Sequence, residues 1–141
     1  MPRTDAKLDL LRQTWLFSGL NRRELATVAR AADQISVPTG TVLIKEGDRG
    51  REFYLILRGT AAVRRGGRRV TSLGPGRYFG ELALLDRGPR SATVVAENDM
   101  ELLVLEQRAF GGVLQEIPGL ALKLLVATAQ RLREADTKAL H

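Results

Sequence analysis

Residues 74–91 read GPGRYFGELALLDRGPRS, and this stretch separates two short apolar runs that predict β-strands, Val70–Leu73 and Ala92–Val95. An antiparallel hairpin commonly joins its strands through about two to five residues, and this connection is far longer. Long ordered connections inside small domains are typically functional. We therefore expect the stretch to form a binding site between two strands.

The residue types in this stretch suit an anionic ligand. Gly80 precedes a predicted short helix over residues 81–85, whose first N–H groups lack helical partners and attract an anion. Arg90 offers a planar guanidinium that pairs with two phosphate oxygens and keeps its charge when desolvated. Pro89 stiffens the approach, and Ser91 adds a hydroxyl and a backbone N–H. Together these residues predict a phosphate site.

One carboxylate, Glu81, lies among these donors and would repel a phosphate that it faced. A sugar hydroxyl beside the phosphate would use it as an acceptor, so a sugar phosphate accounts for Glu81 and Arg90 together. Each residue alone has a simpler interpretation: a turn at Gly80, a helix-dipole charge at Glu81, and a surface ion pair between Arg90 and Asp86. Their combination in one long connection favours a binding site.

The composition excludes several classes of function. The chain has 141 residues, no cysteine and one histidine, the C-terminal His141. Thiol nucleophiles, disulfides, zinc sites and histidine bases are therefore excluded, and we expect no enzyme activity, metal or cofactor. Lys123 interrupts the last apolar run and no apolar signal core follows Met1, so we expect no membrane span and a cytoplasmic location. The net charge of +6 favours an anionic partner.

Outside the quoted stretch, apolar and β-branched runs alternate with Gly- and Pro-containing turns over about residues 34–105. This pattern predicts an antiparallel β-roll, or jelly roll. Helical periodicity over about residues 5–33 and 106–137 predicts N-terminal helices and a C-terminal lid helix. The expected fold is α+β, in a single domain of residues 1–141. The predicted strands are Ile35–Val37, Thr41–Ile44, Phe53–Leu57, Ala61–Arg64, Val70–Leu73, Ala92–Val95 and Glu101–Leu105.

Individual helices have recognisable ends and faces. The first is predicted over about residues 5–17. In the second, Asn21 and Glu24 form a capping box. Pro118 fits the first turn of the final helix. We expect that helix to direct one apolar row toward the core, and to offer a second row to the roll or to another copy of the chain. The first row is Leu122, Leu125, Val126, Ala129 and Leu132, and the second is Leu120, Leu124 and Ala127.

The segments FGELALL (residues 79–85) and PRSATV (residues 89–94) closely resemble the phosphate-binding cassette of cyclic nucleotide-binding domains. This family includes bacterial catabolite-activator-type proteins and protein kinase A regulatory subunits. The resemblance covers about residues 15–135. Residues 46–48 and 53–56 resemble its early turns and strands, and the helix after Pro118, with Arg131-Leu132, resembles the long helix of the catabolite activators.

The resemblance implies a role for each matching residue. Glu81 would accept a hydrogen bond from the ribose 2'-hydroxyl, and Arg90 would neutralise the cyclic phosphate. The backbone N–H groups of Leu82, Ala83 and Ser91, next to Gly80, would bind phosphate oxygens.

Two further features bear on the base. Ala135 and Asp136 occupy the positions where hydroxylated residues meet adenine in the catabolite activators, so this chain departs from the pattern there. Ser91 stands where a threonine is associated with guanine in the family, which favours cyclic AMP over cyclic GMP. The expected protein is a sensor that signals by lid-helix movement to a separate effector protein or through a homodimer.

Three alternatives compete with this interpretation. Four arginines around a Gly66-Gly67 hairpin tip, Arg64 to Arg69, indicate a basic nucleic-acid-binding or regulatory protein. No aromatic residue lies among them and no helix-turn-helix is predicted, so we expect no specific nucleic acid. The second alternative is a structural relative that keeps the fold and binds no ligand. The presence of both Glu81 and Arg90 argues against it, because such a protein does not need that pair. Acid hydrolysis by Glu46 and Asp48 is the third alternative, although their Gly-flanked turn favours solvated carboxylates.

Overall fold

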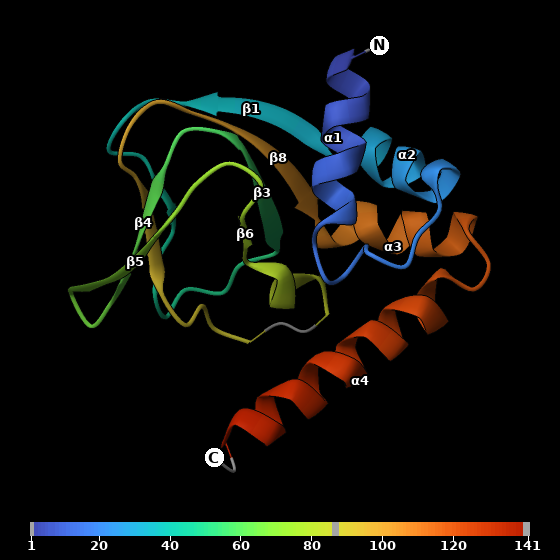
Figure 1. Cartoon of the computed structure of the whole chain (residues 1–141). Coiled ribbons are helices and arrows are strands. Elements are labelled where there is room, and N and C mark those ends of the chain that lie inside the picture. Colours follow the sequence, from blue (N-terminus) through green and yellow to red (C-terminus); the bar gives the residue numbers. More distant parts are fainter. Residues whose placement is uncertain (1, 86–87, 140–141) are drawn as a thin grey trace.

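A roll of two antiparallel sheets lies beside three short helices, and one long helix extends below them (Figure 1). The structure is a computed structural model that describes residues 2–85 and 88–139, with side chains at most of these positions. The predicted α+β class and β-roll are confirmed. The helices are α1 (Pro2–Arg12), α2 (Arg22–Ala31), α3 (Gln107–Glu116) and α4 (Leu120–Ala139), and the 3-10 helix η1 covers Glu81–Leu84.

In the described residues, each sheet has four strands, with the orders β1-β8-β3-β6 and β2-β7-β4-β5. Burial alternates along β7, where Val94 and Ala96 are buried and Thr93 and Val95 are only half-buried. This is the period-2 pattern expected of a strand with one face toward a core. The strands are β1 (Asp33–Val37), β2 (Val42–Ile44), β3 (Glu52–Arg58), β4 (Ala61–Arg65), β5 (Arg68–Leu73), β6 (Tyr78–Phe79), β7 (Thr93–Ala96) and β8 (Met100–Glu106).

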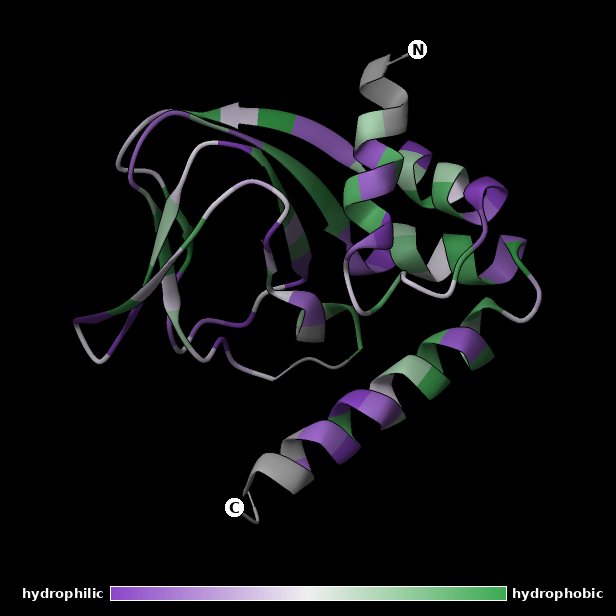
Figure 2. Ribbon diagram, in the orientation of Figure 1, coloured by the Kyte–Doolittle hydropathy of each residue, from purple (hydrophilic) through white to green (hydrophobic). Residues whose placement is uncertain are grey.

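Aromatic residues join the helices to one end of the roll. The ring of Phe17 meets those of Phe53 and Phe110 edge to face, with centroid distances of 5.8 and 6.4 Å. Inside the roll, Tyr54 stacks on Phe79 at 4.9 Å. Figure 2 shows a long hydrophobic stretch in β8 and hydrophobic turns in the helices beside it. These contacts fix the helices to the sheet that carries β3 and β6, next to the quoted stretch.

The end of the first helix and the strand β6 differ from the prediction. The first helix ends at Arg12 instead of about residue 17, because the chain continues in tight turns in which the buried Thr14 donates its hydroxyl to the Leu11 carbonyl at 2.8 Å. The capping box of α2 is confirmed: the Glu24 N–H donates to Asn21 Oδ1 at 2.9 Å, and the Asn21 N–H donates to Glu24 Oε1 at 3.0 Å. The two-residue strand β6 was not predicted, because two residues are too few to show periodicity.

The start and the faces of α4 correct two further predictions. Pro118 lies in the turn before the helix, since Gly119 has a φ of +86° that a right-handed helix does not allow. The predicted faces are reversed, because Leu120 and Leu124 are buried in the core. The row expected to face the core instead contains Leu122, Leu125, Val126 and Leu132, all of them exposed.

Candidate functional site

A cavity of about 340 Å³ opens between the long connection and the second sheet. It brings together most of the residues predicted to bind a ligand, namely Gly80, Glu81, Ala83, Arg90 and Ser91. The side chain of Leu82 lies outside the described residues, and its backbone is part of η1. The sequence therefore identified one wall of a real cavity.

Arg90 is the most constrained polar residue of this wall. Only 9% of its surface is exposed. Its Nη2 donates to the Glu52 carbonyl at 2.8 Å, and Nη1 donates to the Gly80 carbonyl at 3.4 Å. The Glu52 carboxylate also lies 3.5 Å from Nη2 as an ion pair. The guanidinium is thus held in place at the cavity wall before any ligand contact.

Two glycines make room for this guanidinium. At Gly80, which has a φ of +78°, a Cβ atom would lie 2.7 Å from Arg90 Nη1 and 2.8 Å from the Glu52 carbonyl. At Gly50, a Cβ would overlap the Arg90 guanidinium itself. Any side chain at either position would displace the charge, so Gly50 and Gly80 together define a slot for Arg90.

The turn between β2 and β3 fixes the backbone of Arg90 as well. The Arg90 N–H donates to the Asp48 carbonyl at 2.8 Å, and the Arg90 carbonyl accepts from the Gly47 N–H at 2.9 Å. Sequence reasoning missed Gly50 and Glu52 as parts of the site. The only signal was the glycine-rich composition of residues 46–50, because their approach to Arg90 depends on how the two sheets fold together.

The short helix after Gly80 is wound more tightly than an α-helix and ends at Leu84 instead of residue 85. It is a 3-10 helix, and the Ala83 N–H donates to the Gly80 carbonyl at 3.1 Å. A phosphate bound by the Ala83 N–H would therefore share or replace that bond. Glu81 lines the cavity and is half-buried, with neither a hydrogen bond nor an ion pair inside the described part of the chain. Its carboxylate is available as an acceptor.

The opposite wall of the cavity is mostly apolar. It contains Ile44, Val63, Leu73 and Val94 of the second sheet, and Arg65 at the end of β4 is its charged residue. Tyr78 also lines the cavity, and burial is the main cause that raises the pKa of its phenol above the ordinary value of 10.0. The hydroxyl therefore stays neutral at physiological pH. A ligand with an anionic end and a flat apolar end would fit this cavity, with the anionic end at the Arg90 wall and the apolar end at the opposite wall.

Of the two predicted base-contact residues, only Asp136 has a described side chain, and it is not among the residues that line the cavity. Asp136 is exposed near the end of α4, and the side chain of Ala135 lies outside the described residues. No side chain of α4 in the described part of the chain lines the cavity. Figure 1 shows α4 running below the roll. Contact between the base and α4 thus stays a prediction.

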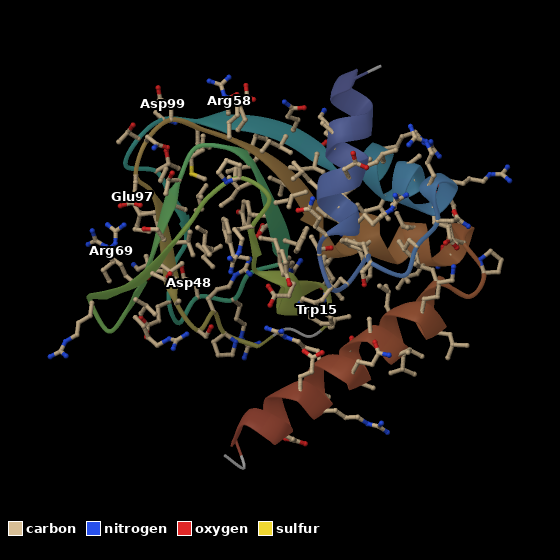
Figure 3. All side chains as sticks on the ribbon, viewed as in Figure 1. Trp15, Asp48, Arg58, Arg69, Glu97 and Asp99 are labelled. Carbon is tan, nitrogen blue, oxygen red and sulfur yellow. The ribbon has the colours of Figure 1, made fainter. Side chains whose placement is uncertain are left out.

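The basic hairpin and the acidic turn have structural partners. Arg69 and Glu97 form an ion pair at 2.5 Å at the edge of the roll, where Figure 3 shows the two side chains near each other. The Gly66 N–H donates to Glu46 Oε1 at 2.9 Å, which ties the hairpin tip to the turn after β2. Glu46 thus has a structural partner, which does not favour its predicted alternative role in hydrolysis.

Within residues 2–85 and 88–139, no helix combines the length and the apolar character that crossing a bilayer requires. Over the same described residues, no group of histidine, aspartate or glutamate side chains is placed to hold a metal ion.

The arrangement of the cavity agrees with a sequence comparison. Residues 34–116 match the pattern of the cyclic nucleotide-binding domain. The chain belongs to the cyclic nucleotide-binding domain family. The predicted resemblance is thereby confirmed, and the family segment includes the whole cassette and both glycines of the Arg90 slot.

Three similar proteins illustrate the breadth of this family. The cyclic AMP receptor protein of Thermus thermophilus is 38% identical over 126 residues, which are 86% of this chain and 58% of that protein. The cGMP-dependent protein kinase of Toxoplasma gondii is 30% identical over 133 residues, which are 94% of this chain and 13% of the kinase. The solved N-terminal domain of a transcriptional regulator from Streptomyces coelicolor has a TM-score of 0.86 and 32% identity, covering 92% of this chain and 94% of that one.

Proposed function

We propose that this chain, acting as a single domain of residues 1–141, is a cyclic nucleotide sensor that prefers cyclic AMP. The observation that carries the proposal is the buried Arg90, held by Glu52 and Gly80 beside a cavity whose other wall is mostly apolar. Family membership supports the same ligand class. The proposed role is one of binding, and no catalytic step is assigned.

In this proposal each end of the nucleotide meets matching chemistry. Arg90 pairs with the cyclic phosphate, assisted by the N–H groups of Leu82, Ala83 and Ser91. Glu81 accepts a hydrogen bond from the ribose 2'-hydroxyl, which is supported by its position in the cavity and by the absence of a partner for its carboxylate among residues 2–85 and 88–139. The base lies along the apolar wall. Cyclic AMP is preferred on the ground that Ser91 replaces the threonine associated with guanine, while similar proteins are named for either nucleotide.

Movement of α4 carries the signal in this proposal. Its first turns are attached to the body through Leu120, Leu124 and an ion pair at 2.8 Å between Lys123 and Glu24. Farther along, Leu125 and Leu132 are exposed, so the helix carries apolar surface that can cover the base or pair with a second copy or an effector protein. Sedimentation velocity with and without cyclic AMP tests this part: a change in oligomeric state or shape is expected.

Isothermal titration calorimetry with cyclic AMP and cyclic GMP tests the binding function. We expect saturable binding of both with cyclic AMP tighter. Arg90→Ala should lose about 2–5 kcal/mol of binding, because it removes a desolvated charged hydrogen bond. Glu81→Ala should lose less, about 0.5–1.5 kcal/mol, since its partner is a neutral hydroxyl. Arg58→Ala is the matched control, because Arg58 is exposed and lies outside the cavity.

Three results would contradict parts of the proposal. A flat titration with both nucleotides would remove the function. Equal or reversed affinities would remove the preference for cyclic AMP. A folded Arg90→Ala variant that binds as well as the parent would remove the assigned phosphate site, and circular dichroism of each variant establishes that it is folded.

A further inference from the structure

The charges around the cavity do not favour an anion as strongly as Arg90 alone suggests. The Glu52 carboxylate lies 3.5 Å from Arg90 Nη2 and offsets its positive charge. Glu81 adds a second carboxylate at the cavity wall. These three residues together carry a net negative charge, which opposes the entry of a cyclic phosphate monoanion. A further cation close to the cavity would therefore favour the entry of the phosphate.

Arg65, at the end of β4, is such a cation. It lines the same cavity as Arg90, Ser91 and Glu81. Its Nε donates to the Ser91 carbonyl at 3.1 Å, which places the guanidinium beside the predicted phosphate contacts. Inside the described part of the chain, no carboxylate pairs with Arg65 and its Nη atoms have no acceptor. Within the described residues its guanidinium therefore has no ion-pair partner, in contrast to that of Arg69, which pairs with Glu97.

We propose that Arg65 is a further ligand-binding residue, which supplies the unpaired positive charge for the nucleotide phosphate and holds Ser91 in position for it. This inference rests on the proposed function. A fork that is anchored through Nε keeps its two Nη groups free for oxygen acceptors, so it can reach a phosphate oxygen without losing the Ser91 contact. The basic hairpin thereby forms part of the sensor site.

The chain contains a close control for this role. Arg68 lies directly opposite Arg65 in the β4–β5 register, carries the same charge and does not line the cavity. Arg65→Met and Arg68→Met therefore remove one positive charge from the same hairpin, with the same loss of long-range attraction. Any difference in binding between them reports the local position of Arg65.

Calorimetry with cyclic AMP and cyclic GMP on the parent and both variants tests the proposal. Arg65→Met should weaken both nucleotides about fivefold, the upper range for a partly exposed ion pair, and by the same factor because the phosphate is common to both. Arg68→Met should change either affinity less than about twofold. Arg65→Lys keeps the charge but loses the Nε contact with Ser91, so its affinity should lie between those of Arg65→Met and the parent. Melting temperatures without ligand should not differ, since Arg65 is exposed.

The outcomes separate this inference from the proposed function. If the parent binds and Arg65→Met matches Arg68→Met, the role of Arg65 is wrong and the sensor function stands. If Arg65→Lys binds the nucleotides as weakly as Arg65→Met, or if the loss of affinity differs between the two nucleotides, the proposal that the Arg65 charge acts on the phosphate is wrong. A parent that binds neither nucleotide overturns both proposals.

Discussion

The phosphate side of the cavity is held by more contacts with the rest of the fold than the C-terminal helix is. Arg90 is fixed through its backbone to the turn after β2 and through its side chain to Glu52 and Gly80. In α4, Leu120 and Leu124 are buried near the start, whereas the large apolar side chains farther along, Leu125, Val126 and Leu132, are exposed. The binding element is thus preorganised, which lowers the cost of ordering on binding. The element proposed to move has few buried contacts, as segments of low local stability do.

The anchor of α4 gives the largest expected effect. Leu124 is 3% exposed and Leu125, the next residue, is 65% exposed. Leu124→Ala should lower the free energy of unfolding by about 2–5 kcal/mol, because it opens a cavity in the core. Leu125→Ala changes the same atoms on the exposed face and should stay within about 0.5 kcal/mol. Urea unfolding of both variants measures the difference, and equal losses would show that the two faces are wrongly assigned.

A smaller effect is expected at the preorganised side. Gly50→Ala places a Cβ on the Arg90 guanidinium, so the slot must open. Overpacking of this kind typically costs about 1–3 kcal/mol of stability. Because the displaced charge is the one assigned to the phosphate, cyclic AMP affinity should fall by at least about tenfold.

Gly74→Ala is the control for this prediction. Gly74 lies in the long connection, has no positive φ, and its Cβ would meet no atom within 4 Å. In calorimetry the Gly74→Ala variant should bind cyclic AMP with the affinity of the parent. If Gly50→Ala also bound normally, the slot would not be needed to position Arg90.

The smallest effect concerns pH. The hydrogen bond from Lys123, followed by the one from the Asn21 backbone, lowers the pKa of Glu24 below its ordinary value of 4.5. The folded state therefore binds fewer protons than the unfolded state near this pH. The resulting stabilisation is complete above about pH 4.5 and is lost as the pH falls through the folded-state pKa. It should not exceed about 1 kcal/mol, because the Lys123 side chain is 43% exposed.

Lys123→Met tests the linkage. The variant should lose part of its stability at neutral pH and show a weaker fall in the free energy of unfolding between about pH 5 and pH 3. Urea unfolding at several pH values measures both. A variant with the same acid dependence as the parent would show that the contact between α2 and α4 contributes nothing measurable.

Local patterns in the chain explain what the sequence was able to predict. The capping box of Asn21 and Glu24 depends on a spacing of three residues, and the cassette from Gly80 to Ser91 depends on the order of its residues. Both can be recognised without the rest of the fold, as can the alternation of apolar and turn residues that indicates a roll. The α+β class, the family and the residues lining one wall of the cavity follow from such patterns.

Contacts between distant segments were decided only by the tertiary structure. Gly50, Glu52 and Arg65 reach the cassette because the turn before β3, the start of β3 and the end of β4 fold against it. The choice between the two apolar rows of α4 likewise depends on where α2 and α3 lie, since both rows have helical spacing. Sequence periodicity determines that a face is apolar. Which face is buried, and which charge meets which partner, is set by packing between elements that the sequence does not place.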